Sequence, residues 1–522
     1  MLPAFLAVWF IPGFTTQDGP GHIYNAHILL ELFKPDSFFH NYYVVNPHLA
    51  PNLVGHWLLV GLLSVLSPQI SDKVMMTITG TGVAAAVMWL RWRVVGWEGF
   101  ALAAPLAVVI SLNLIWLLGF YNFLVGTCLF TLTLGWWWEA RKQVGVKYCL
   151  ILAALFVAGY LCHIVSLVFT VLSIVVLAIM EDRDRRLKLW LWTALSFLPL
   201  LPLLLVYKSL TQAGDASIMW MTDINPLSPA SWLNFILAPS PLALNNQNIL
   251  PFVEKSSSLF RFASPTLWIA VAIPLLLWVA LAYRNRERRF FVEENSRWLI
   301  LGVILLVIGL IAPDGLGANH GSFLRMRILL LALITLLPAL TFDLNRLAGK
   351  LGYAATLVAL ILQSAFVWEY AFTTHRNRQK FMQAVGAVGD KQRIVTVTID
   401  TKGRFNPNPL LHINYMLGVN NHNILWGNYQ ASSYYFPTKF VTQEYCQRST
   451  DLQRVELFDT TNSETVYQGK INYWANLLAQ IHTETDVLVV WGFDEKLDSI
   501  HCKWFDSTPI FANEKTRVFR HQ

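Results

Sequence analysis

The chain has 522 residues, of which 55% are hydrophobic and 14% are charged, a composition that excludes an ordinary water-soluble protein. Its net charge of +7 does not indicate a nucleic-acid partner, because residues 381–522 hold 13 basic against 14 acidic side chains. The remaining 26 basic and 18 acidic residues lie mostly in short loops between apolar runs, as in membrane proteins whose cytoplasmic loops collect Lys and Arg. We therefore predict an integral membrane protein that binds no nucleic acid.

Apolar runs dominate the first 370 residues and predict a polytopic α-helical membrane protein with about 10–11 transmembrane helices. A spanning helix takes roughly 20 apolar residues, because each backbone amide must bond within its own helix once water is absent. The candidate segments are 1–14, 52–68, 74–90, 100–118, 120–138, 148–180, 188–207, 264–283, 298–312, 323–342 and 351–372. Together they predict a transmembrane domain over residues 1–375.

Two strongly basic loops, at 181–188 and 284–289, should be cytoplasmic. Counting from them places external loops at 15–51 and 208–263, and places the region after 380 outside. The number of crossings between 52 and 180 stays open. Five crossings put Arg141, Lys142 and Lys147 outside, against the charge rule. A break of the run 148–180 around His163 restores that rule but makes another segment re-entrant.

The external loop 15–51 contains the first charged residue of the chain, Asp18, directly after the first apolar run. A carboxylate at the membrane edge can act as a general base when its surroundings raise its pKa. Asp before Gly-Pro is also a good start signal for a helix, so Asp18 can serve as an N-cap. Apolar residues at helical spacing then predict a helix lying in the membrane interface, through Ile23, Ala26, Leu30 and Phe33.

Residues 380–522 predict a small soluble α/β domain outside the membrane. Strand-like runs occur at 393–399 and 486–491, and a helical pattern occurs at 470–482. Cys446 and Cys502 lie in this domain and could pair in an oxidising compartment. The segment 409–437 is rich in His, Asn and aromatic residues that could contact sugar, but we expect most of them to be ordinary loop and core residues.

Several polar side chains within or beside apolar runs are candidates for substrate binding. His163 is an ionisable group within the run 148–180, and such residues are functional candidates, although a lone histidine is more often a hydrogen-bonded core residue. His320, Arg325 and Arg327 precede or begin a membrane helix, where they could bind phosphate or reach lipid headgroups. His22, one turn after Asp18, joins this set.

Two further patterns concern the loops. The cluster at 119–123, Gly-Phe-Tyr-Asn-Phe, predicts a turn between two helices. Five histidines gather in or near the first loop, at His22, His27, His40, His48 and His56. Their spacing places no two of them at i and i+4 on one helix, so the sequence does not favour a metal site made by these histidines, and the metal ligands are unknown.

An acidic residue just outside the first membrane helix, an interfacial helix and an aromatic, proline-containing stretch (38–51) resemble the GT-C superfamily of membrane glycosyltransferases, such as protein O-mannosyltransferases and aminoarabinose transferases. The motif-level match is Asp18. Many family members carry a pair of acidic residues in this loop, whereas Gln17 and Gly19 flank Asp18 here.

The resemblance implies transfer of a sugar from a polyprenyl-phosphate donor to a lipid, glycan or protein acceptor on the outer face, with Asp18 as the base. It also implies a location in the bilayer, expected to be a bacterial inner membrane, and it suggests Mg or Mn near Asp18. Nucleotide-binding and HExxH motifs do not occur in the sequence, which is consistent with a lipid-linked donor.

Two alternatives remain at this level. An O-antigen-ligase-like transferase would also use lipid-linked sugars, but such proteins tend to keep a basic late external loop, and 208–263 holds only Lys208, Lys255 and Arg261. A non-enzymatic transporter or flippase usually shows paired halves with polar residues in corresponding helices, a pattern that we do not find here.

Overall fold

The computed structural model describes residues 2–211, 241–242, 294–316, 321–340, 344–345, 347–401, 405–459 and 463–522. These residues form two compact units. The first unit comprises residues 1–5, 49–55 and 76–368, and the second comprises residues 6–48, 56–75 and 369–522. The predicted helix 264–283, the basic loop 284–289 and most of the external loop 208–263 lie outside the described residues.

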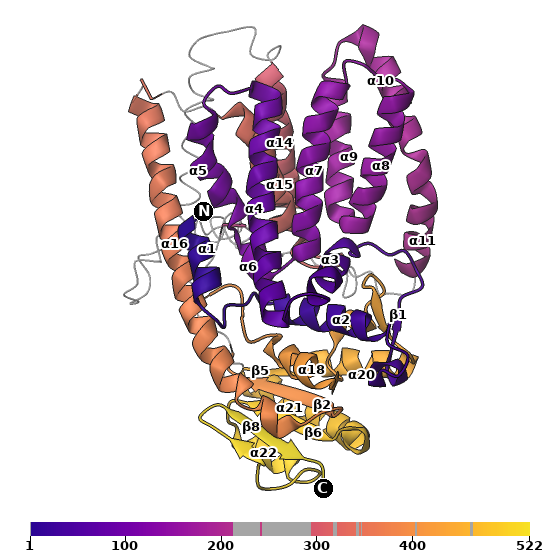
Figure 1. Ribbon diagram of the computed structural model, residues 1–522, viewed down its shortest axis with the longest axis vertical. Helices are drawn as coiled ribbons and strands as arrows, with labels where there is room; N and C mark the ends of the chain where they lie inside the picture. The colour runs from indigo at the N-terminus through magenta and orange to yellow at the C-terminus, as the bar shows by residue number, and fades with distance from the viewer. Residues whose placement is uncertain are drawn as a thin grey trace. The chain divides into compact units, whose positions relative to one another are not determined.

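The first unit is built from apolar helices that match the predicted runs. Its elements are α5 (Phe100–Ser111), α6 (Leu114–Leu118), α7 (Tyr121–Ala140), α8 (Val146–Cys162), α9 (Ile164–Ile179), α10 (Arg183–Ser196), η2 (Leu198–Leu200), α11 (Leu201–Thr211), α14 (Glu294–Ile311), α15 (Leu324–Leu336) and η4 (Leu337–Ala339). Helices α7, α8, α9 and α10 stand side by side (Figure 1). Four more helices belong partly to each unit along the chain, namely α1 (Leu2–Phe10), α3 (Val54–Leu63), α4 (Pro68–Val95) and α16 (Leu347–Met382).

Length and composition make several of these helices membrane spans. Within the described ranges, three helical segments are long and apolar enough to cross a membrane, namely Pro68–Val95, Arg186–Thr211 and Gly349–Val388. Five shorter apolar helices accompany them, at Val54–Leu63, Phe100–Ser111, Val146–Cys162, Ile164–Ile179 and Ser296–Ile311. Each helix bonds its own backbone internally, which is the condition for placing it in lipid.

The long apolar run 148–180 is broken at His163, as one of the two sequence alternatives requires. His163 ends α8 and begins α9, and its backbone is extended there (φ −168°, ψ 124°). Gly119 ends α6 in the left-handed conformation, with φ at 80°, which a residue with a Cβ rarely adopts. The predicted turn is therefore confirmed at Gly119 and Phe120, although α7 already begins at Tyr121, within the predicted range.

A cluster of charged side chains joins the C-terminal ends of α7 and α9 to the start of α14. The Glu181 carboxylate, after α9, accepts from Arg141 Nε at 2.7 Å, after α7, and from an Arg297 guanidinium nitrogen at 2.6 Å, at the start of α14. The loops that hold Arg141 and Glu181 must therefore lie at the same end of the unit. The count of five crossings, which puts Arg141 on the side opposite Glu181, is wrong, because the break at His163 adds a helix that this count omits.

The second unit contains a mixed sheet with the strand order β3-β2-β6-β8-β7, and β5 also pairs with β2. Strand β2 (Arg393–Ile399) is parallel to β6 (Val487–Trp491), and β6 is antiparallel to β8 (Thr516–Arg520). The strands β3 (Ile424–Leu425), β5 (Leu457–Phe458) and β7 (Phe511–Ala512) are short. Both β2 and β6 match the predicted strands, because each is a run of β-branched residues buried on both faces.

Short helices surround this sheet along the chain. They are α17 (Val385–Val388), η5 (Ile413–Tyr415), α18 (Met416–Asn421), α19 (Tyr429–Ser432), α20 (Gln443–Gln453), α21 (Glu464–Ile481), η6 (His482–Glu484) and α22 (Glu495–His501). Helix α21 buries one apolar stripe, including Ile471, Trp474 and Leu478, which explains the helical pattern predicted at 470–482. Cys446 in α20 and Cys502 after α22 are both free thiols.

Most of the first predicted external loop, residues 15–48, is part of this second unit. Its helix α2 (Gly19–Glu31) exists as predicted, but nearly all of its residues are buried, and it packs against α18, η5 and α19. The loop also contains η1 (Phe38–Asn41) and β1 (Tyr43–Val45), and β1 pairs antiparallel with β4 (Thr438–Phe440). The helical spacing thus predicts α2 correctly. Other parts of the protein cover this helix on several sides, and a spacing pattern does not reveal that.

Candidate functional site

Asp18 precedes the first turn of α2 and is only 8% exposed. Its side chain makes no capping hydrogen bond to this helix. The Thr16 hydroxyl instead accepts from the Gly19 amide at 3.0 Å, and Pro20 needs no partner because it has no N–H. The carboxylate is thus turned to other partners, and Gln17 Nε2 donates to its Oδ1 at 3.3 Å.

His412 lies beside this carboxylate, with its Nε2 at 3.5 Å from Asp18 Oδ1. Burial lowers the pKa of His412 to about 3, so the imidazole is neutral at physiological pH. Asp18 and His412 therefore make a contact between a carboxylate and a neutral imidazole, and this contact is not an ion pair. The His412 ring stacks on Tyr429 at 4.9 Å between centroids, which holds the imidazole plane in place.

A second part of the cluster lies one turn along α2. His22 Nδ1 is 3.3 Å from His56 Nε2, and Gln430 reaches both rings at 3.0 Å. The amide settles the protonation pattern, because Gln430 Nε2 can only donate to His22 Nδ1 and Gln430 Oε1 can only accept from His56 Nε2. The His22 ring is then neutral, because its Nδ1 accepts, and His56 Nε2 carries a proton. Gln430 Nε2 also lies 3.2 Å from the Tyr429 hydroxyl oxygen, which links this part to the stacked pair.

A second buried carboxylate comes from the start of α4. Asp72 is 5% exposed, and its Oδ2 accepts from the Thr15 hydroxyl at 3.1 Å. The neighbouring Lys73 donates to the carbonyl oxygens of Trp9 at 3.3 Å and Ile11 at 3.1 Å, at the end of α1. Asp72 also interacts electrostatically with Arg378. The chain therefore does supply a second acidic residue near the Thr15–Asp18 segment, from beyond the loop in which a pair was sought.

A different set of groups occupies the first unit, where the break at His163 faces the start of α15. The Arg327 guanidinium lies 3.3 Å from His163 Nε2, and it sits over the rings of Phe120 and Phe123 at 4.8 and 5.5 Å from their centroids. The Val165 amide points to His163 Nδ1 at 3.2 Å. A neutral imidazole has one acceptor nitrogen, so only one of these two donors can form a true hydrogen bond with it.

Arg325 is fully buried and has other partners. Its Nε and one terminal nitrogen donate to the carbonyl oxygens of Gly309 at 3.4 Å and Leu310 at 3.0 Å, in the last turn of α14. A cation at a helix C-terminus meets the negative end of the helix dipole and satisfies carbonyls that lack intrahelical partners. Two arginines that look equivalent in the sequence therefore have different surroundings, a helix end for Arg325 and aromatic rings with an imidazole for Arg327.

The structure thus assembles the predicted site residues in two groups. Asp18 and His22 belong to one hydrogen-bonded cluster of the second unit, and His163 contacts Arg327 in the first unit. His320 lies outside the described residues. The residues that the sequence analysis did not select are Asp72, His56, His412, Tyr429 and Gln430. A signal existed for three of them, since the segment 409–437 had been noted as rich in His, Asn and aromatic residues but was read as ordinary structure.

Comparison with known proteins identifies the fold. Neither a protein-family model nor a curated protein sequence matches the chain. Among solved structures it is similar to ArnT from Cupriavidus metallidurans, both bound to undecaprenyl phosphate and in the apo state. Each comparison has a TM-score of 0.53 at 11% identity, over 99% of this chain and 96% or 95% of ArnT.

ArnT is an aminoarabinose transferase of the GT-C superfamily. The predicted resemblance to this superfamily is therefore confirmed at the level of fold, as is the predicted class of helical integral membrane protein with a small C-terminal sheet region. The likeness to ArnT is one of fold, and it extends over nearly the whole of both chains.

Proposed function

We propose that the chain is a glycosyltransferase that moves a sugar from a polyprenyl-phosphate donor to an acceptor on the outer face of the membrane, with Asp18 as the general base. The observation that carries this proposal is the contact between the buried Asp18 carboxylate and neutral His412, within a cluster of polar side chains. The ArnT-like fold supports the reaction class, and the undecaprenyl phosphate in one ArnT structure supports the donor class.

The reaction gives each group a defined task. The acceptor O–H or N–H loses its proton to Asp18 as its oxygen or nitrogen forms a bond to the anomeric carbon, and the bond from that carbon to the phosphate oxygen breaks. Attack from the face opposite the leaving group inverts the anomeric carbon. His412 acts as a positioning residue, because a neutral ring stacked on Tyr429 can orient the carboxylate without neutralising it.

The departing polyprenyl phosphate gains negative charge, which a guanidinium stabilises well because it donates in a fixed fork. We assign this task to Arg327, whose guanidinium is held over two aromatic rings beside His163. Arg325, which donates to the end of α14, is assigned to holding the start of α15 in place. His22 and His163 then contribute to substrate binding beside Asp18 and Arg327 respectively, and the region after 380 is proposed to face the outside.

The test is sugar transfer from a radiolabelled polyprenyl-phosphate sugar pool in membranes that express wild type or Asp18→Asn at matched levels. Loss of a general base typically costs about 10²–10⁴-fold in rate, so we expect Asp18→Asn to lose at least 100-fold. Asp36→Asn is the matched control, since Asp36 is an exposed carboxylate in the same loop. Wild-type rates in Asp18→Asn would contradict the assignment of the base, and the lack of transfer by wild type from every donor in the pool would contradict the proposed reaction.

A further inference from the structure

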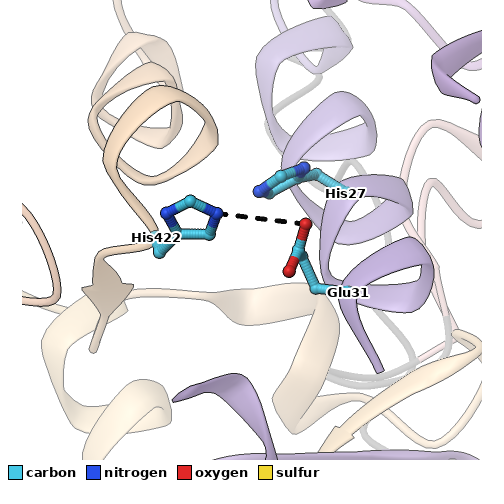
Figure 2. Close-up of side chains that lie close together, drawn as sticks. All are labelled: His27, Glu31 and His422. Atoms are coloured by element: carbon cyan, nitrogen blue, oxygen red, sulfur yellow. Dashed lines mark ion pairs between the residues drawn. The ribbon is translucent and has the colours of Figure 1, made fainter. Parts of the chain in front are cut away.

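A second cluster of chemically reactive side chains lies at the other end of α2. His27 and Glu31 are four residues apart and share one face of this helix, and His422 follows the end of α18. Figure 2 shows the three side chains pointing toward one another. One ligand atom from each, an imidazole nitrogen or a carboxylate oxygen, lies within 4.8 Å of the others. All three residues belong to the second unit.

His27 has an unused lone pair in this cluster. Its Nε2 is buried and makes no hydrogen bond to any residue that the structure describes, although a buried polar atom normally has a partner. Burial lowers the pKa of His27 to about 4, so the ring is neutral and its lone pair is available at pH 7. The ring packs edge-on against Phe39, at 5.8 Å between centroids, which leaves it little freedom to turn to water.

The carboxylate of Glu31 is buried, at 5% exposure for the residue. Its Oε1 accepts from Lys34 Nζ at 2.6 Å, and the Lys34 side chain is 62% exposed. The Ser37 hydroxyl is 3.5 Å from Glu31 Oε2. Since Lys34 reaches the carboxylate from solvent, it can swing away when another cation binds, without leaving a buried charge behind.

His422 is held by its backbone and by a second carboxylate. Its φ is 48° and its ψ is 31°, a left-handed conformation that is unfavourable for a residue with a Cβ. Its Nδ1 lies 3.3 Å from Asp390 Oδ1, and its Nε2 lies 3.9 Å from Glu31 Oε1. A histidine that binds a metal through one nitrogen usually donates its other N–H to a carboxylate, and His422 with Asp390 has this arrangement.

We propose that His27, Glu31 and His422 bind a divalent transition metal, with Zn²⁺ as the best fit. Two imidazoles and one carboxylate are a common zinc ligand set, in which a water or other ligand takes the fourth position. Mg²⁺ and Ca²⁺ prefer oxygen ligands alone, so this site differs in chemistry from the Mg or Mn that the family resemblance suggests near Asp18. His422 is 41% exposed in its side chain, which provides a path for the ion.

The ligand atoms must move closer together to bind one ion. Nitrogen and oxygen ligands lie about 2.0–2.2 Å from a tetrahedral zinc ion, so two of them are about 3.3–3.6 Å apart. The three ligand atoms lie within 4.8 Å of one another, so a separation near that limit must shrink by about 1 Å, which side-chain rotation can provide. The bound ion would link α2, which follows Asp18, to the end of α18 in the C-terminal region. This cross-link would stabilise the second unit.

The test measures zinc binding by the purified full-length protein after treatment with a chelator, by metal analysis after dialysis against zinc and by competition with a chromogenic zinc chelator. We expect one Zn²⁺ per wild-type chain and a rise in melting temperature on adding zinc. His27→Gln and His422→Gln should each weaken binding by more than 100-fold, and Asp390→Asn by about 10–100-fold, as for other outer-sphere partners of metal ligands. His48→Gln, at an exposed histidine of the same loop, should bind like wild type.

No zinc binding by wild type would overturn the proposal, and so would unchanged binding by the double variant His27→Gln/His422→Gln. Size-exclusion profiles and circular dichroism of each variant establish that it is folded before its binding is compared. The proposal also stands apart from the proposed function, because binding and melting are measured without substrate. A catalytically silent protein that binds zinc through these residues supports the site, and an active protein that binds none overturns it.

Discussion

The two clusters of candidate functional residues differ in the sign of their central charge and in the groups that surround it. Around Asp18, a carboxylate contacts the neutral ring of His412, in a cluster that also contains Gln430, His22 and His56. Around Arg327, a cation sits over aromatic rings beside an imidazole. The first environment suits a group that takes up a proton, and the second suits a group that meets an anion without losing its own charge. The difference supports a separate role for each cluster.

The largest expected effect is a loss of transfer rate that distinguishes Arg327 from Arg325. We expect Arg327→Ala to lose about 10²–10³-fold in transfer rate, the usual cost of removing one donor to a developing anion, while Arg327→Lys keeps part of the activity. Arg325→Ala should instead lower the yield of folded protein, because it leaves carbonyls at the end of α14 without their donor. The measurement is transfer per folded molecule, with exposed Lys188→Ala as the control. Equal losses per folded molecule in both alanine variants would contradict the distinction.

A smaller effect is expected at His412. Removing a residue that orients the base should lower kcat by about 10–100-fold, at the low end of the range for acid–base groups, with little change in KM. Since burial lowers the pKa of His412 to about 3, this ring does not titrate between pH 5 and 9. The acid limb of the pH–rate profile should therefore persist in His412→Gln. Disappearance of that limb in the variant would show that His412 is itself the titrating group.

The ion cluster at the other end of the first unit predicts a loss of stability without a specific loss of activity. Glu181→Gln leaves Arg141 and Arg297 facing each other with side chains only 3% and 13% exposed. Breaking a buried pair in this way costs about 3–5 kcal/mol. Glu139→Gln is the matched control, because Glu139 pairs with Arg93 but is 45% exposed and should cost at most about 1 kcal/mol. The two variants are compared by thermal unfolding in detergent and by transfer per folded molecule.

The smallest expected effect is a pH dependence of the stability of the second unit, caused by the buried carboxyl group of Glu456. Burial raises the pKa of Glu456 to about 8, above its value of about 4.5 in the unfolded chain. The neutral carboxyl group therefore contributes its full stability below pH 4.5, and this contribution is lost as the pH rises through 8. His27 and His412 have lowered pKa values of about 4 and 3. Their contribution to the stability of the folded state is therefore lost as the pH falls below 6.5, which is the opposite pH dependence.

The difference between Glu456→Gln and wild type isolates the carboxyl group. We expect the melting temperature of the variant, relative to wild type, to rise steadily between pH 5 and 8. Exposed Glu464→Gln, in the same unit, should follow wild type at every pH. A constant difference between Glu456→Gln and wild type across this range would show that Glu456 is ionised in the folded protein.

Sequence reasoning succeeded where a signal is local. Strands β2 and β6, the turn at Gly119 and the membrane helices each follow from short runs of residues whose spacing or composition specifies one backbone conformation. The arginines of α15 were noticed because charge is costly in an apolar run. The first-loop histidines stand out in the sequence, but the i, i+4 partner of His27 is a carboxylate, Glu31, and not a second histidine.

The sequence by itself determined that this is a polytopic membrane protein with a C-terminal α/β region and that Asp18 lies at the end of its first apolar run, because hydrophobic periodicity and charge are properties of the chain. Tertiary structure alone decided that His412 contacts Asp18, that Asp72 supplies a second carboxylate through Thr15, and that His422 meets His27 and Glu31. The physical reason is that these partners come from distant parts of the chain. Their meeting depends on how β1 pairs with β4 and how α2 packs on α18, and no local pattern encodes that packing.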